Sequence, residues 1–362
     1  MSDKEDINKM LSKIPKLWHI KNKSNDFSYI DSLFSYLSEI KKDISESSNI
    51  DTKTTPYNYS FFHYISYYTY YPKEPFINYK KNSLMFGAFT DQKFKQVEFS
   101  FPLFQDPSSA LNHLDRILSN KEFSSILKKY KTKNILLRDI DDEFVNLLRN
   151  NEDNYNFSLK SLKELNYNIY DLKKTLDLNG EEFSNLRWHL NKFKNSNYRV
   201  EEIKLSDAIK PVIHLIGKWR KKATRDRGFS YVNVRSDKLA ARLFSNIEKY
   251  FALQNINSLV DPKNILSKVL KINGEVAAFN LGFPLGLFNK QKIFAHAVGI
   301  SDISISHLAE YAQYDFWKKV KEKGYKYIND GPTWKNDLET YKNKFRPIKK
   351  ERYYWASISL KE

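Results

Sequence analysis

Apolar and polar residues alternate along the chain in two similar series of predicted elements. The first series has the order strand, strand, helix, helix, strand, helix, strand. Its members are residues 84–89, 94–101, 108–118, 123–130, 135–138, 143–149 and 167–170. Strands and helices mixed in this way indicate an α+β or α/β architecture.

A second series with nearly the same order follows further along the chain. Its members are strands at 268–272, 275–283 and 293–300, a helix from Leu308 that ends near Gly324, a strand at 325–329, a helix from Asn336, and a strand at 352–358. Asn273-Gly274 is a strong signal for a two-residue hairpin turn. The repeated order predicts two related halves, although no residue-level repeat is visible.

The remaining periodic segments predict further elements. They are helices at 28–42, 181–194, 206 onward and 238–254, and a strand at 198–203. Residues 57–71 are crowded with Tyr and Phe, which favours a buried helix over an exposed platform for nucleic-acid bases. Residues 1–25 are polar, and we expect a loosely attached leader.

The end of the second series carries the candidate chemistry. Asp330 follows the strand at 325–329, and open sheets tend to bind ligands at the carboxyl ends of strands. Asp330-Gly331-Pro332 is expected to end that strand. In the next helix, Lys342 lies at the edge of an apolar stripe, so we expect its ammonium to point along a cleft wall. Asp330 is interpreted as binding an ammonium, as orienting a nucleophile, or as a simple turn residue.

Charge adds a candidate partner. Sixty Lys and Arg residues against 43 Asp and Glu give a formal net charge of +17, which favours polyanionic partners, although a lysine-rich composition alone also makes a protein basic. The densest basic cluster ends the helix that starts at residue 206. We predict that its members Arg220, Lys221, Lys222 and Arg225 bind nucleic-acid phosphates; the alternative is a solvated helix end.

Several classes of chemistry are excluded or disfavoured. The chain has no cysteine, which excludes disulfides, thiolate metal sites and cysteine nucleophiles. It has no Walker loop, no dinucleotide-binding glycine motif and no H-E-x-x-H motif. His296, in the middle of a predicted strand, is interpreted as a core histidine rather than a base. No signal peptide and no apolar run of about 18 residues is visible, so we expect a cytoplasmic protein.

Three stretches carry a resemblance to a known family. Near the end of the chain stand GP, YKNKF, a proline at position 347 and RYYW. Residues 169–193 read IYDLKKTLDLNGEEFSNLRWHLNKF, and residues 60–102 run from SFFHYISYYTYYP to FP. In this order they resemble the three motifs of the phosphatidylglycerol lysyltransferase C-terminal-domain family.

The resemblance implies a fold and an activity. The fold is α+β, with two tandem GNAT-like halves packed around a shared cleft: an N-terminal domain at 26–175, after the leader at 1–25, and a C-terminal domain at 176–362. Characterised members of the family take an aminoacyl group from aminoacyl-tRNA. The family motifs match at Lys342, Lys344, Arg352 and Arg187, whereas Asp330 and Trp334 depart from the commoner family residues.

We therefore expect a soluble aminoacyltransferase that uses aminoacyl-tRNA and a lipid headgroup, peptide, or small amine or hydroxyl acceptor. Lys342 and Asp330 are the predicted catalytic residues, with Lys342 stabilising the developing oxyanion or the terminal phosphate. Arg187, Lys344 and Arg352 are the predicted substrate-binding residues. The predicted tRNA-binding residues are Arg220, Lys221, Lys222 and Arg225. We expect no resident cofactor or metal, and a possible partner besides tRNA is an anionic membrane surface.

Two alternatives stay open. The first is an acyl-CoA-dependent N-acyltransferase, disfavoured because the loop at 301–306 has no glycine and carries Asp302 where such enzymes hold the coenzyme A pyrophosphate. The second is a non-catalytic protein that binds tRNA or an anionic surface on the same scaffold.

Overall fold

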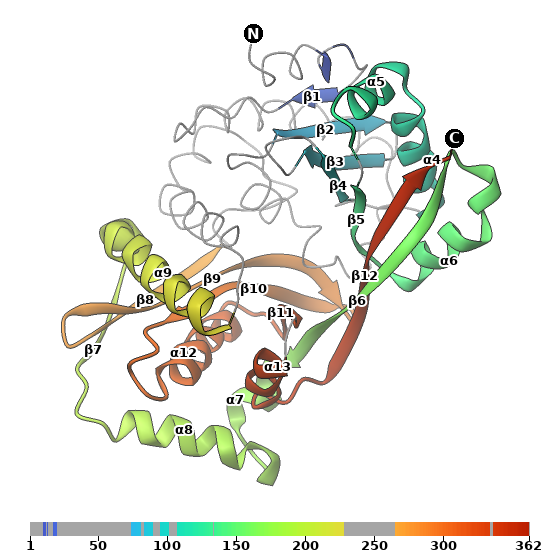
Figure 1. The fold of residues 1–362 in the computed structure, drawn as a ribbon. Helices are drawn as coiled ribbons and strands as arrows, with labels where there is room; N and C mark the ends of the chain where they lie inside the picture. The colour runs from blue at the N-terminus through green and yellow to red at the C-terminus, as the bar shows by residue number, and fades with distance from the viewer. Residues whose placement is uncertain are drawn as a thin grey trace. The chain divides into compact units, whose positions relative to one another are not determined.

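The structure is a computed structural model, and it describes residues 10–11, 13, 17–19, 74–80, 83–89, 95–100, 107–132, 134–227, 265–333 and 336–361. The helices predicted at 28–42, 57–71 and 238–254 lie outside the described residues, as does Trp334. Within the described ranges, the elements are mixed strands and helices (Figure 1).

The chain forms two compact units, and the second is inserted into the first. Unit 1 comprises Met1–Leu165 together with Arg352–Glu362, and unit 2 comprises Asn166–Glu351. The strand β6, Phe157–Asp171, therefore begins in unit 1 and ends in unit 2. The predicted division at residue 175 and the predicted shared cleft stay predictions.

Unit 1 contains a mostly antiparallel sheet with strand order β1-β2-β3-β4-β5-β12-β6. Its strands besides β6 are β1 Leu17–His19, β2 Glu74–Lys80, β3 Ser83–Phe89, β4 Gln96–Ser100, β5 Asn134–Ile140 and β12 Lys349–Leu360. The neighbours β4 and β5 are parallel, and the helices are α4 Pro107–Leu118, α5 Lys121–Lys129 and α6 Asp142–Asn150. The apolar sides of these helices pack with the strands into one core.

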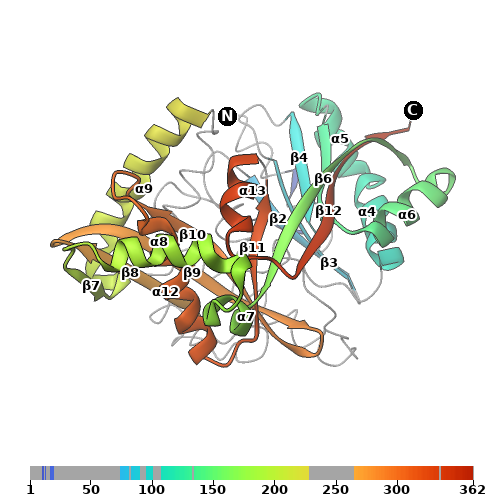
Figure 2. The same ribbon diagram turned by 90° about the horizontal axis from the view of Figure 1, so that it is seen from below.

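Unit 2 has the strand order β6-β11-β10-β9-β8-β7. The strands are β7 Val200–Ile203, β8 Leu266–Ile272, β9 Glu275–Phe288, β10 Gln291–Ser301 and β11 Tyr327–Thr333. The helices are α7 Leu172–Asp177, α8 Ser184–Lys194, α9 Leu205–Arg227, α12 Leu308–Glu322 and α13 Asn336–Asn343. Figures 1 and 2 show α9 and α12 on opposite faces of β8, β9 and β10.

Local sequence signals account for several turns. Asn273 and Gly274, between β8 and β9, have φ of 52° and 87°, the positive values that a tight hairpin turn needs. Gly324 ends the segment after α12 with φ of 85°. The predicted hairpin and the predicted end of that helix are therefore confirmed.

One prediction near the candidate site was wrong in its detail. Asp330-Gly331-Pro332 does not end the strand, because β11 continues to Thr333. Instead, the pairing of β11 with β6 shifts between Asn329 and Pro332, so the extra residues form a bulge. The bulge turns the carbonyl groups of this segment away from the β6 ladder and leaves them to other partners.

Aromatic side chains form the core beneath this bulge. The Tyr170 and Trp317 rings lie 4.8 Å apart between centroids, and the Trp317 and Phe345 rings 5.0 Å apart. Tyr170 comes from β6, Trp317 from α12, and Phe345 from the segment after α13. All three are fully buried, so these elements hold the surrounding polar groups in fixed positions.

Candidate functional site

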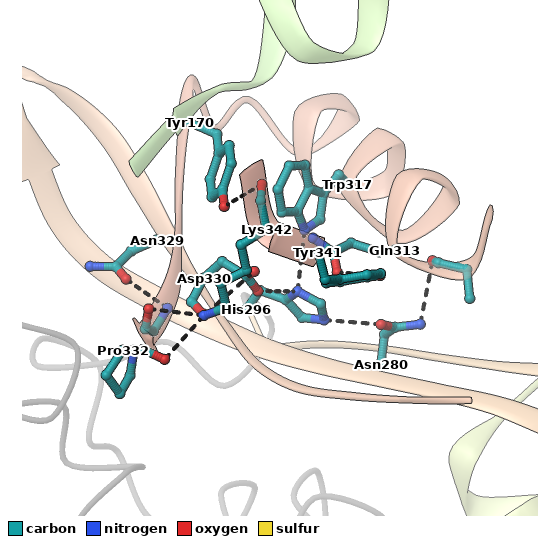
Figure 3. A network of polar contacts seen from close by, with 12 residues as sticks. Tyr170, Asn280, His296, Gln313, Trp317, Asn329, Asp330, Pro332, Tyr341 and Lys342 are labelled. Atoms are coloured by element: carbon teal, nitrogen blue, oxygen red, sulfur yellow. Dashed lines mark hydrogen bonds and ion pairs between the residues drawn. The ribbon is translucent and has the colours of Figure 1, made fainter. Parts of the chain in front are cut away.

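The polar centre of unit 2 lies where the pairing between the parallel strands β10 and β11 ends. Ala295 pairs with Asn329, so His296 and Asp330 follow side by side. Asp330 Oδ1 lies 2.8 Å from His296 Nδ1 (Figure 3). The other ring nitrogen of His296 lies 2.9 Å from Asn280 Oδ1, on β9. Asp330 and His296 thus share a buried contact fixed by two neighbouring strands.

Lys342 enters the same centre from α13. Its Nζ donates hydrogen bonds to the carbonyl oxygens of Asp330, Gly331 and Pro332, the last two at 3.0 and 3.3 Å. It also lies 3.7 Å from Asp330 Oδ2, and its side chain is only 6% exposed. The ammonium therefore satisfies the carbonyl groups that the bulge releases, and ties α13 to β11 (Figure 3).

The charge states of this centre follow from its burial and its partners. Burial alone would raise the pKa of Asp330, but Lys342 and His296 hold that pKa below its usual range. Burial lowers the pKa of Lys342, and Asp330 partly opposes this change. Asp330 is thus an ionised carboxylate whose Oδ1 is bonded to His296, while Oδ2 is 3.7 Å from Lys342 and beyond hydrogen-bond distance.

Two tyrosines and a glutamine surround the carboxylate. Tyr170 donates to the backbone oxygen of Lys342 at 3.1 Å, and Tyr341 donates to Gln313 Oε1 at 3.0 Å. Burial, with the negative charge of Asp330, raises the pKa of Tyr170 well above its usual range. Burial and the carboxylates of Glu310 and Asp330 do the same for Tyr341. Both hydroxyls are therefore neutral donors at neutral pH.

A second polar group lies at the start of α12. Lys344 Nζ is 2.6 Å from Glu310 Oε1, and His189 Nδ1 is 3.7 Å from the same oxygen. His189 Nδ1 also lies 2.7 Å from Nδ1 of His307, with the ring of Trp188 edge-on to both imidazoles. Burial lowers the pKa of His189, although Glu310 opposes the change.

Backbone N–H groups of the loop that leads into α12 have hydrogen-bond partners within the loop. Asp302 Oδ1 accepts from the backbone nitrogen of Ser304 at 2.9 Å, and Asp302 Oδ2 lies 2.7 Å from Lys218 Nζ of α9. The backbone nitrogens of Ile305 and Leu308 donate to carbonyl oxygens within the loop. Burial would raise the pKa of Asp302, but the bonds from Lys218 and Ser304 lower it to about 2.

The described residues contain no group of three or more His, Asp or Glu side chains placed to hold a metal ion. Nor does any helix in those residues have the length and apolar character to span a membrane.

Comparison with known proteins decides the family. The model of the family described as "Phosphatidylglycerol lysyltransferase, C-terminal" matches residues 129–356. The chain belongs to this family. The match includes all of the polar centre of unit 2, and it bears out the resemblance of the sequence motifs.

Solved structures agree on the fold. A conserved protein of unknown function from Bacteroides thetaiotaomicron is 18% identical, with a TM-score of 0.62 over 89% of this chain and 97% of that one. The C-terminal domain of a putative lysylphosphatidylglycerol synthetase from Agrobacterium fabrum is 11% identical, with a TM-score of 0.50 over 88% and 92%. L-PGS from Bacillus licheniformis is 12% identical, with a TM-score of 0.50 over 90% and 91%. Among curated proteins, the comparison found no relative.

The predicted α+β fold class is thus confirmed, and the protein shares its fold with these solved structures. At these identities the solved structures establish the fold alone. The family is one of aminoacyl or acyl transferases, which bears out the expected enzyme class at that level.

The positions matched to this family have different surroundings. Lys342 and Lys344, from the YKNKF motif, lie in the two polar groups described above. Arg187 donates from one nitrogen to the backbone oxygens of Leu178 and Gly180, at 2.5 and 2.6 Å, and thereby holds the end of α7. Arg352 belongs to unit 1, where its exposed guanidinium lies 3.2 Å from Asp142. Substrate-binding roles for Arg187, Lys344 and Arg352 stay predictions.

The structure adds detail to two sequence interpretations. The ammonium of Lys342 points into the bulge of β11, and its proposed oxyanion role stays a prediction. The helix α9 extends to Arg227 and so includes Arg220, Lys221, Lys222 and Arg225. The positions of those four side chains lie outside the described part of the chain, so tRNA binding by this cluster also stays a prediction.

Sequence reasoning missed Gln313 and Asn280, which contact the polar centre. Gln313 sits between Ala312 and Phe316, within the apolar stripe that predicted α12, and it is only 5% exposed. A polar residue inside an apolar stripe was the available signal. Asn280 had no such signal, because its neighbours in β9 are buried on both faces.

Proposed function

We propose that this protein is an aminoacyltransferase that moves an aminoacyl group from aminoacyl-tRNA to an amine or hydroxyl acceptor, with Asp330 binding the amino group of the donor. The observation that carries the proposal is the carboxylate of Asp330. It is buried, ionised, and bonded to His296 through one oxygen, while Oδ2 remains 3.7 Å from Lys342. A substrate ammonium can therefore donate to Oδ2, whereas a simple acyl chain offers no such donor.

The loop before α12 supports a donor other than acyl-CoA. In a helix-terminal phosphate site, free backbone N–H groups and the helix dipole hold the anion. Here Asp302 and carbonyl oxygens of the loop accept the N–H bonds of Ser304, Ile305 and Leu308. The Asp302 carboxylate, ionised at neutral pH, would also repel a pyrophosphate at this position.

The reaction needs few groups from the protein. The acceptor nitrogen or oxygen attacks the ester carbonyl carbon of the aminoacyl-tRNA, and the bond from that carbon to the ribose oxygen breaks. The departing ribose oxygen takes up a proton and becomes a hydroxyl as tRNA leaves, and the acceptor loses one. Asp330 and its neighbours contribute by positioning the aminoacyl group, because alignment of the ester with the acceptor supplies much of such a rate enhancement.

The remaining expectations concern partners. The basic cluster of α9 supplies the charge for tRNA phosphates, so binding should weaken steeply with salt. Charged tRNA is a cytoplasmic substrate, and we place the reaction there. A lipid acceptor would bring the protein to an anionic membrane surface, as the name of the Agrobacterium relative suggests for that protein.

The test compares donors directly. The purified full chain is incubated with tRNA charged with radiolabelled amino acids, or with labelled acetyl-CoA, together with phospholipid vesicles, amines and peptides. We expect label to move from charged tRNA to one acceptor class, and mass spectrometry then identifies the product. Asp330→Asn is the matched inactive variant. Transfer from acetyl-CoA alone would overturn the proposal, and tRNA binding without any transfer would favour a non-catalytic protein.

A further inference from the structure

Two buried amide side chains beside Asp330 each have one end without a hydrogen-bond partner. Gln313 Oε1 accepts from Tyr341, but Gln313 Nε2 has no partner. Asn168 Nδ2 donates to Thr333 Oγ1 at 3.1 Å, but Asn168 Oδ1 has no partner. Gln313 is 5% exposed and Asn168 is fully buried. Within the described residues, these are the only atoms of unit 2 in this condition.

Leaving such atoms unpaired is costly. A buried polar group without a partner costs about 1–3 kcal/mol, and native proteins keep few of them. One of these atoms is a donor and the other an acceptor, so each calls for the opposite kind of group. A ligand that offers both an acceptor and a donor would satisfy the pair.

Both atoms lie close to Asp330, on two different elements. Gln313, from α12, bonds to Tyr341, and Figure 3 shows both side chains next to His296 and Asp330. Asn168, on β6, stands between Tyr167 and Ile169, whose partners on β11 are Pro332 and Asn329, so it lies opposite the bulge that contains Asp330. Asn168 and Tyr170 share a face of β6, and Tyr170 bonds to Lys342 on that face.

We infer that Gln313 Nε2 and Asn168 Oδ1 form a recognition pair for an α-aminoacyl ester. Gln313 Nε2 donates to the ester carbonyl oxygen, and Asn168 Oδ1 accepts from the α-ammonium beside Asp330. This inference rests on the proposed function, and it adds the two residues that tell an aminoacyl group from a plain acyl group. A plain acyl ester satisfies Gln313 but leaves Asn168 unpaired.

The two residues of the pair should affect different kinetic constants. The carbonyl oxygen gains negative charge in the transition state, so the bond from Gln313 strengthens there and should affect kcat. The ammonium keeps its charge throughout, so the bond to Asn168 should affect affinity and therefore KM. Because both atoms are covered in the structure, binding has to include an opening step.

The first experiment uses the unaltered protein. Methylamides of alanine, lysine and phenylalanine, and the matching des-amino compounds, are titrated by calorimetry. We expect one amino-acid methylamide to bind roughly 10–100-fold more tightly than its des-amino counterpart, the effect of one hydrogen bond to a charged group. Equal affinity for the two members of every pair, or no binding of any probe, overturns the inference.

Variants then test the role of each atom. Each variant is compared with a control that removes the other hydrogen bond of the same side chain. Asn168→Leu should abolish the preference for the amino compound, whereas Asn168→Asp keeps an acceptor and should retain it. Thr333→Val removes the partner of Asn168 Nδ2 and should leave the preference unchanged. Loss of preference with Thr333→Val as well would mean that Asn168 acts only through packing, and it would overturn the assignment.

The same logic applies to Gln313 in the transfer assay with charged tRNA. Gln313→Met should lower kcat by roughly 10²-fold with little change in KM. Tyr341→Phe removes the partner of Gln313 Oε1 but keeps the donor, and should change kcat far less. Equal losses for both variants overturn the role of Gln313. No transfer by the unaltered protein would instead refute the proposed function, while the methylamide titrations still judge the recognition pair.

Discussion

The parallel pair β10–β11 in unit 2 and the parallel pair β4–β5 in unit 1 both end in buried charges, but the charges have different partners. In unit 1, Arg138 of β5 lies 3.4 Å from Glu98 of β4, and its guanidinium carbon is 3.6 Å from the ring centroid of Trp355 on β12. Trp355 Nε1 donates to Asp139 at 3.0 Å. These partners come from β4 and β12, which are strands of the same sheet.

In unit 2 the corresponding charges take partners from helices. Lys342, the cation beside Asp330, comes from α13, while His296 comes from β10. A guanidinium stacked on an aromatic ring is a large, planar arrangement that leaves little room for a ligand. In unit 2, by contrast, the carboxylate between the ammonium and the imidazole is a small group that a ligand can still contact. The same strand geometry therefore supports a packed core in unit 1 and the polar centre in unit 2.

The largest expected effect tests whether Lys342 is structural. Lys342→Met leaves Asp330 and the three carbonyl oxygens of the bulge without their cation. We expect the free energy of unfolding in urea to fall by about 3–5 kcal/mol, the cost of breaking a buried ion pair from one side. Lys349→Met is the control, because Lys349 is 54% exposed beside Glu351, and its loss should cost under about 0.5 kcal/mol. Equal stability of the two variants would remove Lys342 from the support of the bulge.

A second prediction separates activity from stability. Asp330→Asn keeps the shape of the side chain but removes its charge, so turnover with charged tRNA should fall by roughly 10²–10³-fold. Asp139→Asn changes a buried carboxylate in unit 1, and it should leave turnover per folded molecule unchanged. Turnover per folded molecule is measured after circular dichroism has established the folded fraction. A comparable loss for Asp139→Asn would mean that the two strand ends do not differ as described.

A smaller effect is expected from the arginine of unit 1. Arg138→Lys keeps the charge opposite Glu98 but loses the planar stack on Trp355. We expect the free energy of unfolding to fall by about 1 kcal/mol, the size of a partly buried cation–π contact. Turnover should not change. If Arg138→Lys lowers turnover while stability stays the same, the strand end of unit 1 also takes part in the reaction.

The smallest effect concerns pH. The pKa of His189 is lowered in the folded protein, so between pH 7 and pH 5 the unfolded chain binds a proton that the folded chain resists. The free energy of unfolding should therefore decrease as pH falls below the unfolded pKa of about 6.5. His189→Gln should flatten this decrease. His113→Gln in unit 1 is the control, because His113 contacts Asn78 rather than a second imidazole. Identical pH profiles for both variants would exclude His189 as the source.

Local patterns were sufficient for much of this fold. The order of elements in both series, the Asn273-Gly274 turn and the end of α12 were predicted, because each depends on residues close in sequence. The extent of β6 was not predicted, since most of its first half is half-buried or exposed and has no simple alternation. The strand β2 was also missed, because Pro75 and the run of polar residues around it weaken the strand pattern.

The candidate site was predictable in part for the same reason. Asp330 was placed at the carboxyl end of a strand, and Lys342 at the edge of an apolar stripe. The direction of the Lys342 ammonium was not predictable, because it depends on a shift in pairing between β11 and β6, which are far apart in sequence. Gln313 and Asn168 resemble ordinary positions of a helix and a strand. Their importance appears only when the hydrogen-bond partners of each atom are known.

The late position of β12 in the chain also matters during synthesis on the ribosome. The edge of β5 is covered by Ala356, Ser357 and Ile358, which are translated more than 200 residues after Ile140. Until then, nascent unit 1 presents the unpaired backbone groups of β5, while all of unit 2 emerges first. An exposed edge of this kind invites pairing with another chain. The N-terminal unit is therefore the last to be completed, and until β12 appears the edge of β5 stays open to such pairing.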